Sequence, residues 1–244
     1  MQFRNRMIAL LLCLLVGFTL ISCQSISAIL KPTPALTATP TQTATVTPTL
    51  TAIPTPDPNT SPITFGLSTG TSYRNEYFNI ALDVNDRWFI NTTSQYDLEN
   101  GFSAQLPDEQ REPLYLEYLS SGAPVEDYYA VLHSGLKEIT IEINLIAPMK
   151  EIFPDATSLQ EAIAQDIRES FKQEGTQIEV DSISNITIAG QQASCWNFSY
   201  AGDGYQIYTA QISIWRGDYN IGILLSSIGE DALQEMIAMF HTMN

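Results

Sequence analysis

Two histidines and one internal cysteine are the side chains of this sequence best suited to metal binding or nucleophilic catalysis. His133 and His241 are the only histidines, and neither has a second His or a Cys beside it at ligand spacing. We interpret both as surface or boundary residues; the alternative is a two-histidine metal site completed by distant carboxylates. Cys195 falls in the middle of an expected strand, which favours a small buried thiol over a nucleophile.

Carboxylates are abundant enough to suggest acid–base or calcium chemistry. The chain has 27 acidic residues, so pairs that lie close in space are expected from number alone. Asp108-Glu109 and Glu126-Asp127 fall in stretches that read as polar loops, which makes them candidate calcium ligands, although the EF-hand loop pattern is absent. We therefore expect solvated surface charge, no catalytic residue and no cofactor, and leave calcium open.

The N-terminus carries a signal of a different kind. Arg4 and Arg6 precede an apolar run from Met7 to Ile21 that is short for a membrane span and ends in Leu20-Ile-Ser-Cys23. This ending resembles the lipobox of bacterial lipoprotein precursors. The resemblance implies cleavage before Cys23 and diacylation of its thiol, which makes Cys23 the predicted lipid-attachment residue. The alternatives are an ordinary secretory signal with an incidental cysteine, or an uncleaved anchor.

Net charge restricts the partners of the mature chain. The full sequence has 11 basic and 27 acidic residues, a net charge of −16. Cleavage before Cys23 would remove two basic residues and no acidic one, leaving 9 against 27, or −18. Such a polyanion is repelled by nucleic acids and by anionic lipid head groups, so nucleic-acid binding is disfavoured. Cys195 would be the only thiol left in the folded part, which excludes an internal disulfide.

Composition divides the chain into three parts. Residues 31–62 hold eight of the thirteen prolines and are rich in Thr, and proline removes backbone donors and fixes φ. We therefore predict a signal peptide at 1–22, a disordered Thr/Pro-rich tether at 23–62, and one globular domain at 63–244.

Hydrophobic periodicity sets the elements of the globular part. Leu159, Ile163, Ile167 and Phe171 recur every four residues, which predicts a helix over 158–173 that begins at a Ser158–Glu161 capping box and stops near Gly175. A second helix is expected over 230–242. Period-two runs predict strands over the following ranges: 78–82, 87–90, 115–119, 128–132, 139–145, 177–188, 191–200, 205–216 and 219–226.

The connections between the last strands indicate hairpins. Ala201–Gly204 and Arg216-Gly-Asp218 supply glycines for tight turns, so we interpret the latter as turn chemistry and not as an adhesion tripeptide. The run Ile221–Leu225 is apolar on both faces, which implies cover on both sides of the sheet. The expected class is α+β, one layered domain with a mainly antiparallel sheet and a helix on each face.

One family resemblance agrees with this layout. Tyr73-Arg-Asn-Glu-Tyr-Phe-Asn-Ile80 followed by Trp88, the hairpin entry at 188–193 and a final helix resemble PsbP-like domains. That family includes photosynthetic extrinsic subunits and many bacterial lipoproteins. The resemblance implies an α/β/α sandwich and carries no shared catalytic residues.

These observations favour a lipid-anchored extracytoplasmic domain of a non-catalytic binding or envelope-assembly type. Its expected partners are the membrane, through the lipid, and an envelope protein, a polymer or a small ligand. The alternative is a carboxylate-dependent hydrolase acting on envelope glycan, which needs two carboxylates about 5–9.5 Å apart in a cleft. A purely structural spacer is the third possibility.

Overall fold

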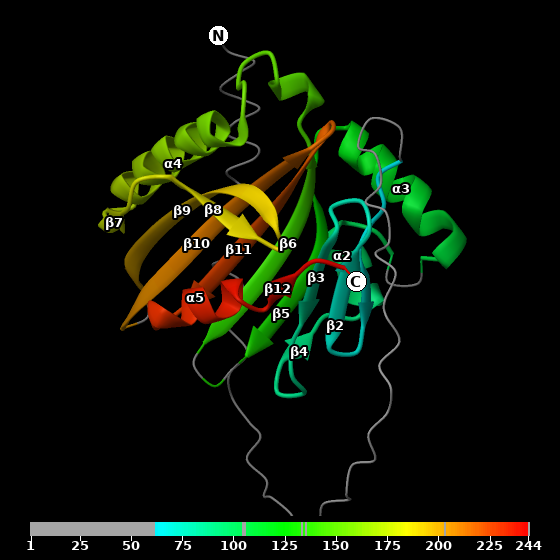
Figure 1. The fold of residues 1–244 in the computed structure, drawn as a ribbon, viewed down its shortest axis with the longest axis horizontal. Helices are drawn as coiled ribbons and strands as arrows, with labels where there is room; N and C mark the ends of the chain where they lie inside the picture. Colours follow the sequence, from blue (N-terminus) through cyan, green and yellow to red (C-terminus); the bar gives the residue numbers. More distant parts are fainter. Residues whose placement is uncertain (1–61, 104–105, 133, 135, 203, 244) are drawn as a thin grey trace, which may run out of the picture. The chain divides into compact units, whose positions relative to one another are not determined.

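The computed structural model describes residues 62–243 except 104–105, 133, 135 and 203. Cys23, His133, the predicted signal peptide and nearly all of the predicted tether lie outside the described residues. The described chain is an α+β domain built on an eight-stranded and a four-stranded sheet, both antiparallel (Figure 1). Over this part of the chain, no helix is both long enough and apolar enough to cross a bilayer.

The large sheet has the strand order β4-β5-β6-β11-β10-β9-β7, with β8 also paired to β9. In that order its strands are β4 (Phe89–Ile90), β5 (Val125–Leu132), β6 (Lys137–Leu145), β11 (Tyr219–Ser227), β10 (Tyr205–Arg216), β9 (Gln191–Gly202), β7 (Ile178–Val180) and β8 (Ser184–Ile188). The predicted strand over 177–188 is thus two short strands. The other predicted strands from 128 onward are confirmed, with ends that move by a few residues.

The small sheet has the order β1-β2-β3-β12. Its strands are β1 (Leu67–Thr69), β2 (Ser72–Asn75), β3 (Ile80–Asp83) and β12 (Phe240–His241). Phe240 pairs with Leu82, so the C-terminal end of the described chain joins the sheet formed by its N-terminal end.

Tight turns connect the long strands. The β10–β11 hairpin closes at Arg216 and Tyr219 around Gly217, whose φ is 54°, and Lys150 Nζ donates to Asp218 Oδ1 at 2.9 Å. Arg216 lies over the ring of Tyr77. The structure therefore uses all three residues of the Arg-Gly-Asp tripeptide to build and hold a turn, as predicted.

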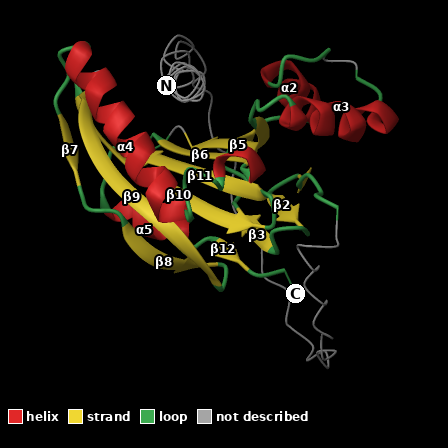
Figure 2. Ribbon diagram, turned by 90° about the horizontal axis from the view of Figure 1, so that it is seen from above, coloured by secondary structure: helices red, strands yellow, loops and turns green. Residues whose placement is uncertain are grey.

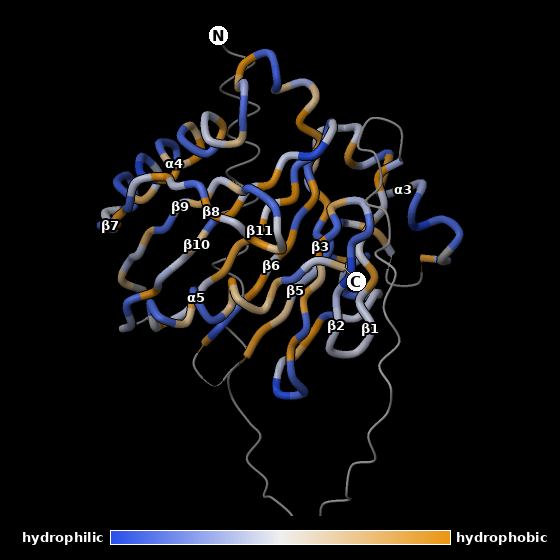
Figure 3. Tube along the Cα trace, in the orientation of Figure 1, coloured by the Kyte–Doolittle hydropathy of each residue, from blue (hydrophilic) through white to orange (hydrophobic). Residues whose placement is uncertain are grey.

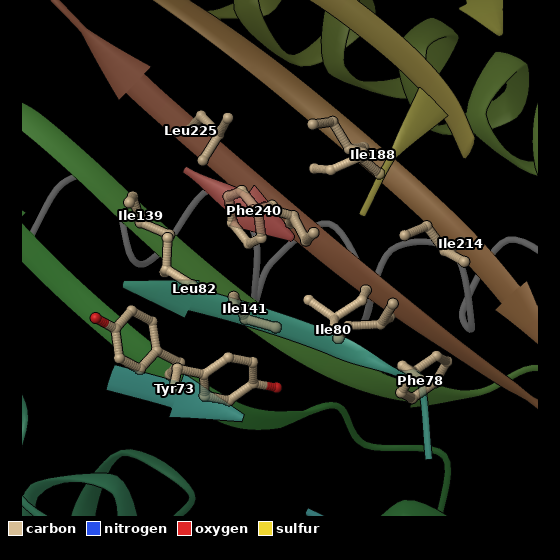
Figure 4. Packing of buried hydrophobic residues seen from close by; sticks show 14 of the residues in the cluster. Tyr73, Phe78, Ile80, Leu82, Ile139, Ile141, Ile188, Ile214, Leu225 and Phe240 are labelled. Atoms are coloured by element: carbon tan, nitrogen blue, oxygen red, sulfur yellow. The ribbon is translucent and has the colours of Figure 1, made fainter. Parts of the chain in front are cut away.

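The core lies between the two sheets. Along β6 the isoleucines at 139, 141 and 143 are fully buried, whereas the polar residues between them are partly exposed. Figure 3 shows this alternation as orange and blue segments along the strands. We call the side that packs on the small sheet the inner side of the large sheet. Figure 4 shows its packing around Tyr73, Phe78, Ile80, Leu82, Ile139, Ile141, Ile188, Ile214, Leu225 and Phe240.

Helix α4 (Ala156–Gln173) packs on the opposite, outer side of β9 and β10 (Figure 2). Its Gln160 donates to Gln211 O at 2.9 Å and accepts from Ser194 Oγ at 2.9 Å. The predicted helix is confirmed, but it is capped by Asp155, whose carboxylate accepts from the Ser158 amide at 2.8 Å. The predicted Ser158–Glu161 box is therefore wrong by one turn.

Helix α5 (Asp231–Ile237) packs against β11 and β10, and its Leu233 and Met236 join the core cluster on the inner side. The two helices thus cover opposite faces, as predicted. The prediction of a final helix over 230–242 is wrong in length, because Phe240 and His241 leave the helix to pair with β3. The described chain ends after a strand and not on a helix.

Helices α2 (Thr93–Glu99) and α3 (Asp108–Ser120) pack beside β5 and β6. The predictions of an irregular stretch over 91–113 and a strand over 115–119 are wrong. Tyr115 and Leu119 are both buried and lie four residues apart, which is the spacing of one helix face. A short 3₁₀ turn, η2 (Ala147–Met149), follows β6.

Candidate functional site

The outer side of β5, β6 and β11 is the part of the large sheet that remains partly exposed. Inner residues of these strands are buried, whereas Leu224, predicted to be covered, is only partly buried. The sequence predicted cover on both faces of the sheet, but the outer face is only partly covered at β11. We call this surface the open face and define it by its outward residues, of which Glu126 and Asn220 are buried and the others partly exposed: Glu126, Tyr129, Val131, Glu138, Thr140, Glu142, Asn144, Asn220, Gly222, Leu224 and Ser226.

One row of the open face runs straight across the sheet. The antiparallel registers align Glu126 with Glu142, then Glu142 with Gly222, and Gly222 with Ser213. Ser213 in turn pairs with Ser194, which lies under α4. The row therefore leads from two carboxylates, over small residues, to the covering helix.

Gly222 lies at the centre of this row. A Cβ built on it would meet nothing closer than Asn220 Nδ2 at 3.7 Å, and its φ lies outside the left-handed region. Neither crowding nor backbone conformation thus requires glycine here. Its register is continuous with both neighbours, so it marks no bulge. A glycine in the middle of a strand often marks a place where another backbone or a ligand approaches closely.

The two carboxylates at the head of the row repel each other. Directly opposed residues on antiparallel strands have Cβ atoms about 5 Å apart, and like charges there are destabilising. Burial, together with the charges of Glu99 and Glu142, raises the pKa of Glu126 to about 8. Burial likewise raises the pKa of Glu142 to about 7. The side-chain amide of Asn91 lies 3.5 Å from Glu126 Oε1, at the long limit of a hydrogen bond.

Glu138 adds a third carboxylate to the open face. It lies four residues before Glu142 on β6, on the same side of the strand. Burial raises the pKa of Glu138, and a hydrogen bond from the Tyr129 hydroxyl favours its charged form. Thr140 lies between the two glutamates and is partly exposed.

The candidate calcium ligands are not where the sequence interpretation put them. Glu126 and Asp127 lie in strand β5, at a register shift, and not in a loop. Asp127 faces the small sheet, where its carboxylate accepts from the Gly66 amide at 2.8 and 2.9 Å and from Tyr73 Oη at 2.5 Å. A carboxylate satisfied in this way ties the start of the domain to β5. The loop prediction failed because a bulged strand with two acidic residues has no clean alternation.

Asp108 and Glu109 form the first turn of α3, so the loop prediction is wrong for them as well. Across the described residues, no group of three or more His, Cys, Asp or Glu side chains is arranged to hold a metal ion.

Two other residues that the sequence analysis considered for chemistry, Cys195 and His241, lie in surroundings that favour structural roles. Cys195 is buried, and burial raises the pKa of its thiol to about 11, which makes a thiolate nucleophile unfavourable at neutral pH. Its neighbour Trp196 lies on the opposite face of β9, beneath Arg168 of α4. His241 lies at the boundary of the small sheet, with Nε2 2.8 Å from Asp83 Oδ2.

The sequence analysis did not predict the row of carboxylates on the open face. The signal was present in β6, whose residues alternate Glu138, Thr140, Glu142 and Asn144 with apolar positions. The apolar half of that pattern identified the strand. The pairing of Glu126 with Glu142 depends on the register of β5, which the bulge sets.

No family model matches the chain, and no curated protein matches its sequence. Among solved structures, cyanobacterial PsbP (CyanoP) from Synechocystis sp. PCC 6803 is similar, with a TM-score of 0.43 and 11% identity over 72% of this chain and 95% of that one. LpqN, involved in cell envelope biogenesis of Mycobacterium tuberculosis, is similar with a TM-score of 0.34 and 13% identity over 68% and 83% of the two chains. No residue role carries over from either protein.

Proposed function

We propose that this protein is a lipid-anchored extracytoplasmic domain that binds a partner of the cell envelope through the open face and does not catalyse a reaction. The observation that carries the proposal is the open face itself. The inner side of the same strands is closely packed, whereas the outer side keeps polar side chains partly exposed, among them Glu138, Thr140 and Glu142 beside the buried Glu126. Surfaces that carry local repulsion of this kind are commonly retained for function at some cost in stability.

The anchor in this proposal is Cys23. Two acyl chains give stable membrane attachment, whereas one chain alone gives marginal binding. A tether of this composition extends by ~3.1 Å per residue, so residues 23–62 would let the domain reach on the order of 100 Å from the bilayer. Mass spectrometry of the mature N-terminus tests the anchor. We expect a diacylated Cys23 in wild type and loss of acylation and of detergent partitioning in Cys23→Ala.

The binding face is tested by site-specific photocrosslinking in cells. A photoreactive amino acid in place of Thr140, on the open face, should give a discrete adduct with an envelope component. The matched control replaces Thr187, an exposed threonine of β8 that lies outside the open face. Adducts of equal yield at both positions, or none at Thr140, would remove the open face as the binding surface and leave a structural spacer.

The opposed pair Glu126 and Glu142 is the observation that favours the alternative, a hydrolase of envelope glycan. Such enzymes need one protonated and one ionised carboxylate, so their environments must drive the two pKa values apart. Here both pKa values are raised, to about 8 and about 7. The two pKa values are therefore raised together and are not driven apart as that mechanism requires. Release of reducing ends from soluble glycan fragments by wild type, lost in Glu142→Gln, would reverse this conclusion.

A further inference from the structure

We propose that the partner of the open face is an extended basic segment of another protein, which lies along β6 and places Lys or Arg side chains on Glu138 and Glu142, both of which are partly exposed. This inference deepens the proposed function and rests on its premise that the open face is a binding surface.

The spacing of the carboxylates sets the spacing of the cations. Glu138 and Glu142 are four residues apart on one strand, which is ~13 Å at about 3.3 Å per residue. Residues four apart on a second extended chain have the same separation and point to the same side. A helix advances only about 6 Å over four residues, so its cations would not match both positions. The open face thus favours an extended partner.

The charge of the open face is not neutralised locally by the nearest basic residues. Lys137, adjacent to Glu138, is directed to the inner side, where Nζ lies 2.6 Å from Glu235 Oε2 of α5. Lys150, which follows β6, donates to Asp218 at 2.9 Å. The charges that raise the pKa of Glu126 are those of other carboxylates, Glu99 foremost. A cationic partner would therefore relieve a repulsion that the fold leaves in place.

The centre of the row can accept a backbone. Gly222 presents no side chain beside Glu142, and Ser213 beyond it is small and already hydrogen bonds to Asn220 Oδ1 at 2.6 Å. At the margin of the same face, Trp215 pairs with Asn220, and its buried indole N–H has no hydrogen-bond partner within the described residues.

Two other occupants fit less well. A second copy of this chain would oppose one set of carboxylates to another, which is unfavourable. A single metal ion would not engage Glu138 and Glu142 together, because they are separated by ~13 Å along β6.

The test uses the full-length protein in a non-ionic detergent and two fluorescein-labelled peptides of identical composition, rich in Thr and Ser. One peptide carries two lysines four residues apart, and the other carries them three residues apart, which places them on opposite sides of an extended chain. We expect the first peptide to bind about ten-fold more tightly in fluorescence anisotropy at low ionic strength, a difference of about 1.4 kcal/mol.

Variants identify the face that binds. Glu142→Gln and Glu138→Gln should each weaken binding of the first peptide roughly five-fold or more, whereas Glu179→Gln, on the exposed edge strand β7, should not. Thr140→Lys, which places a cation between the two glutamates, should abolish binding without removing a carboxylate. Thermal melts of each variant confirm that it is folded.

Equal affinity for the two peptides, or an equal effect of Glu179→Gln, would reduce the interaction to general charge attraction and overturn the inference. A Thr140 crosslink in cells without binding of either peptide would keep the open face as a binding surface but overturn the basic, extended partner. Calcium binding that is lost in Glu142→Gln, in the absence of peptide binding, would replace the peptide by a metal ion and overturn it too.

Discussion

Glu126 of β5 and Glu142 of β6 stand directly opposite each other in the antiparallel register, on the outer side of the sheet. At another place in the domain one buried acidic side chain is paired with a cation: Asp97, fully buried, is held by Arg111 through contacts of 2.8 and 2.9 Å. The Glu126–Glu142 pair is held instead by proton uptake, since burial raises the pKa of both carboxyls toward neutrality. The open face is therefore a place where charge state and stability are coupled.

Glu126→Gln should stabilise the protein at alkaline pH and flatten its pH dependence. In the unfolded chain the carboxyl titrates near 4.5, and in the fold its pKa is raised to about 8. Between these values the folded state binds more protons than the unfolded state, so stability falls as pH rises. The stabilising contribution of protonated Glu126 is complete below pH 4.5 and is lost as pH rises through about 8.

The measurement is urea unfolding followed by tryptophan fluorescence at pH 5 and pH 8. At ~1.4 kcal/mol per pKa unit, and with part of the effect shared with Glu142, the variant should gain about 2 kcal/mol over wild type at pH 8 and little at pH 5. Glu179→Gln, at an exposed edge position, should leave the pH dependence unchanged. A Glu126→Gln variant that loses stability at pH 8 would show that the carboxylate is favourably held.

Arg111→Met should destabilise the protein by about 3 kcal/mol, because it leaves the Asp97 carboxylate buried without its cation. Asp97 would keep only neutral donors such as the Tyr115 hydroxyl, now 2.9 Å from Oδ1. Arg87→Met, at an exposed arginine, is the control and should change the free energy of unfolding by less than ~0.5 kcal/mol. Equal effects of the two substitutions would mean that the Asp97–Arg111 pair adds nothing to stability.

Gly66→Ala should destabilise the domain by roughly 2–3 kcal/mol through crowding alone. A Cβ at this position would overlap the ring of Tyr73 and lie 2.7 Å from Asp127 Oδ2, and Tyr73 is fully buried and cannot move aside. Gly229→Ala is the matched control, since a Cβ there meets nothing within 4 Å. Chemical denaturation should show normal stability for the Gly229 variant, and similar stability for the Gly66 variant would contradict the tight packing at Asp127.

Local sequence patterns predicted the parts of the fold in which apolar residues recur with one clear spacing. The isoleucines of β6 and the stripe of α4 each mark one buried face, and the glycine of the 216–218 turn supplies a positive φ. The second half of the sheet could therefore be predicted nearly strand by strand.

The elements that failed are those in which a tertiary contact decides the outcome. α3 carries Pro113 and has a weak apolar stripe, so Tyr115 to Leu119 could be read as a strand. In the fold Tyr115 and Leu119 lie on one buried helix face, and the Asp97–Arg111 pair joins α3 to α2. The end of α5 is set by the pairing of Phe240 with Leu82, which are far apart in sequence. The open face depends in the same way on strand register. The opposition of Glu126 and Glu142 exists only because a bulge follows Glu126.

Leu136→Asn should stabilise the protein by roughly 0.5–1 kcal/mol. Leu136 precedes β6 with a φ of 48°, a left-handed conformation that is unfavourable for a side chain such as leucine and tolerated by asparagine. The chain itself uses asparagine at Asn79, where φ is 52°. Leu136 is 37% exposed, so its replacement removes little core contact.

Leu67→Asn, on the exposed edge strand β1, is the control and should stabilise nothing, because asparagine is disfavoured in strands. The midpoints of urea unfolding compare the two variants, and a gain at Leu67 that equals the gain at Leu136 would show that lower surface hydrophobicity, and not relief of backbone strain, is the cause.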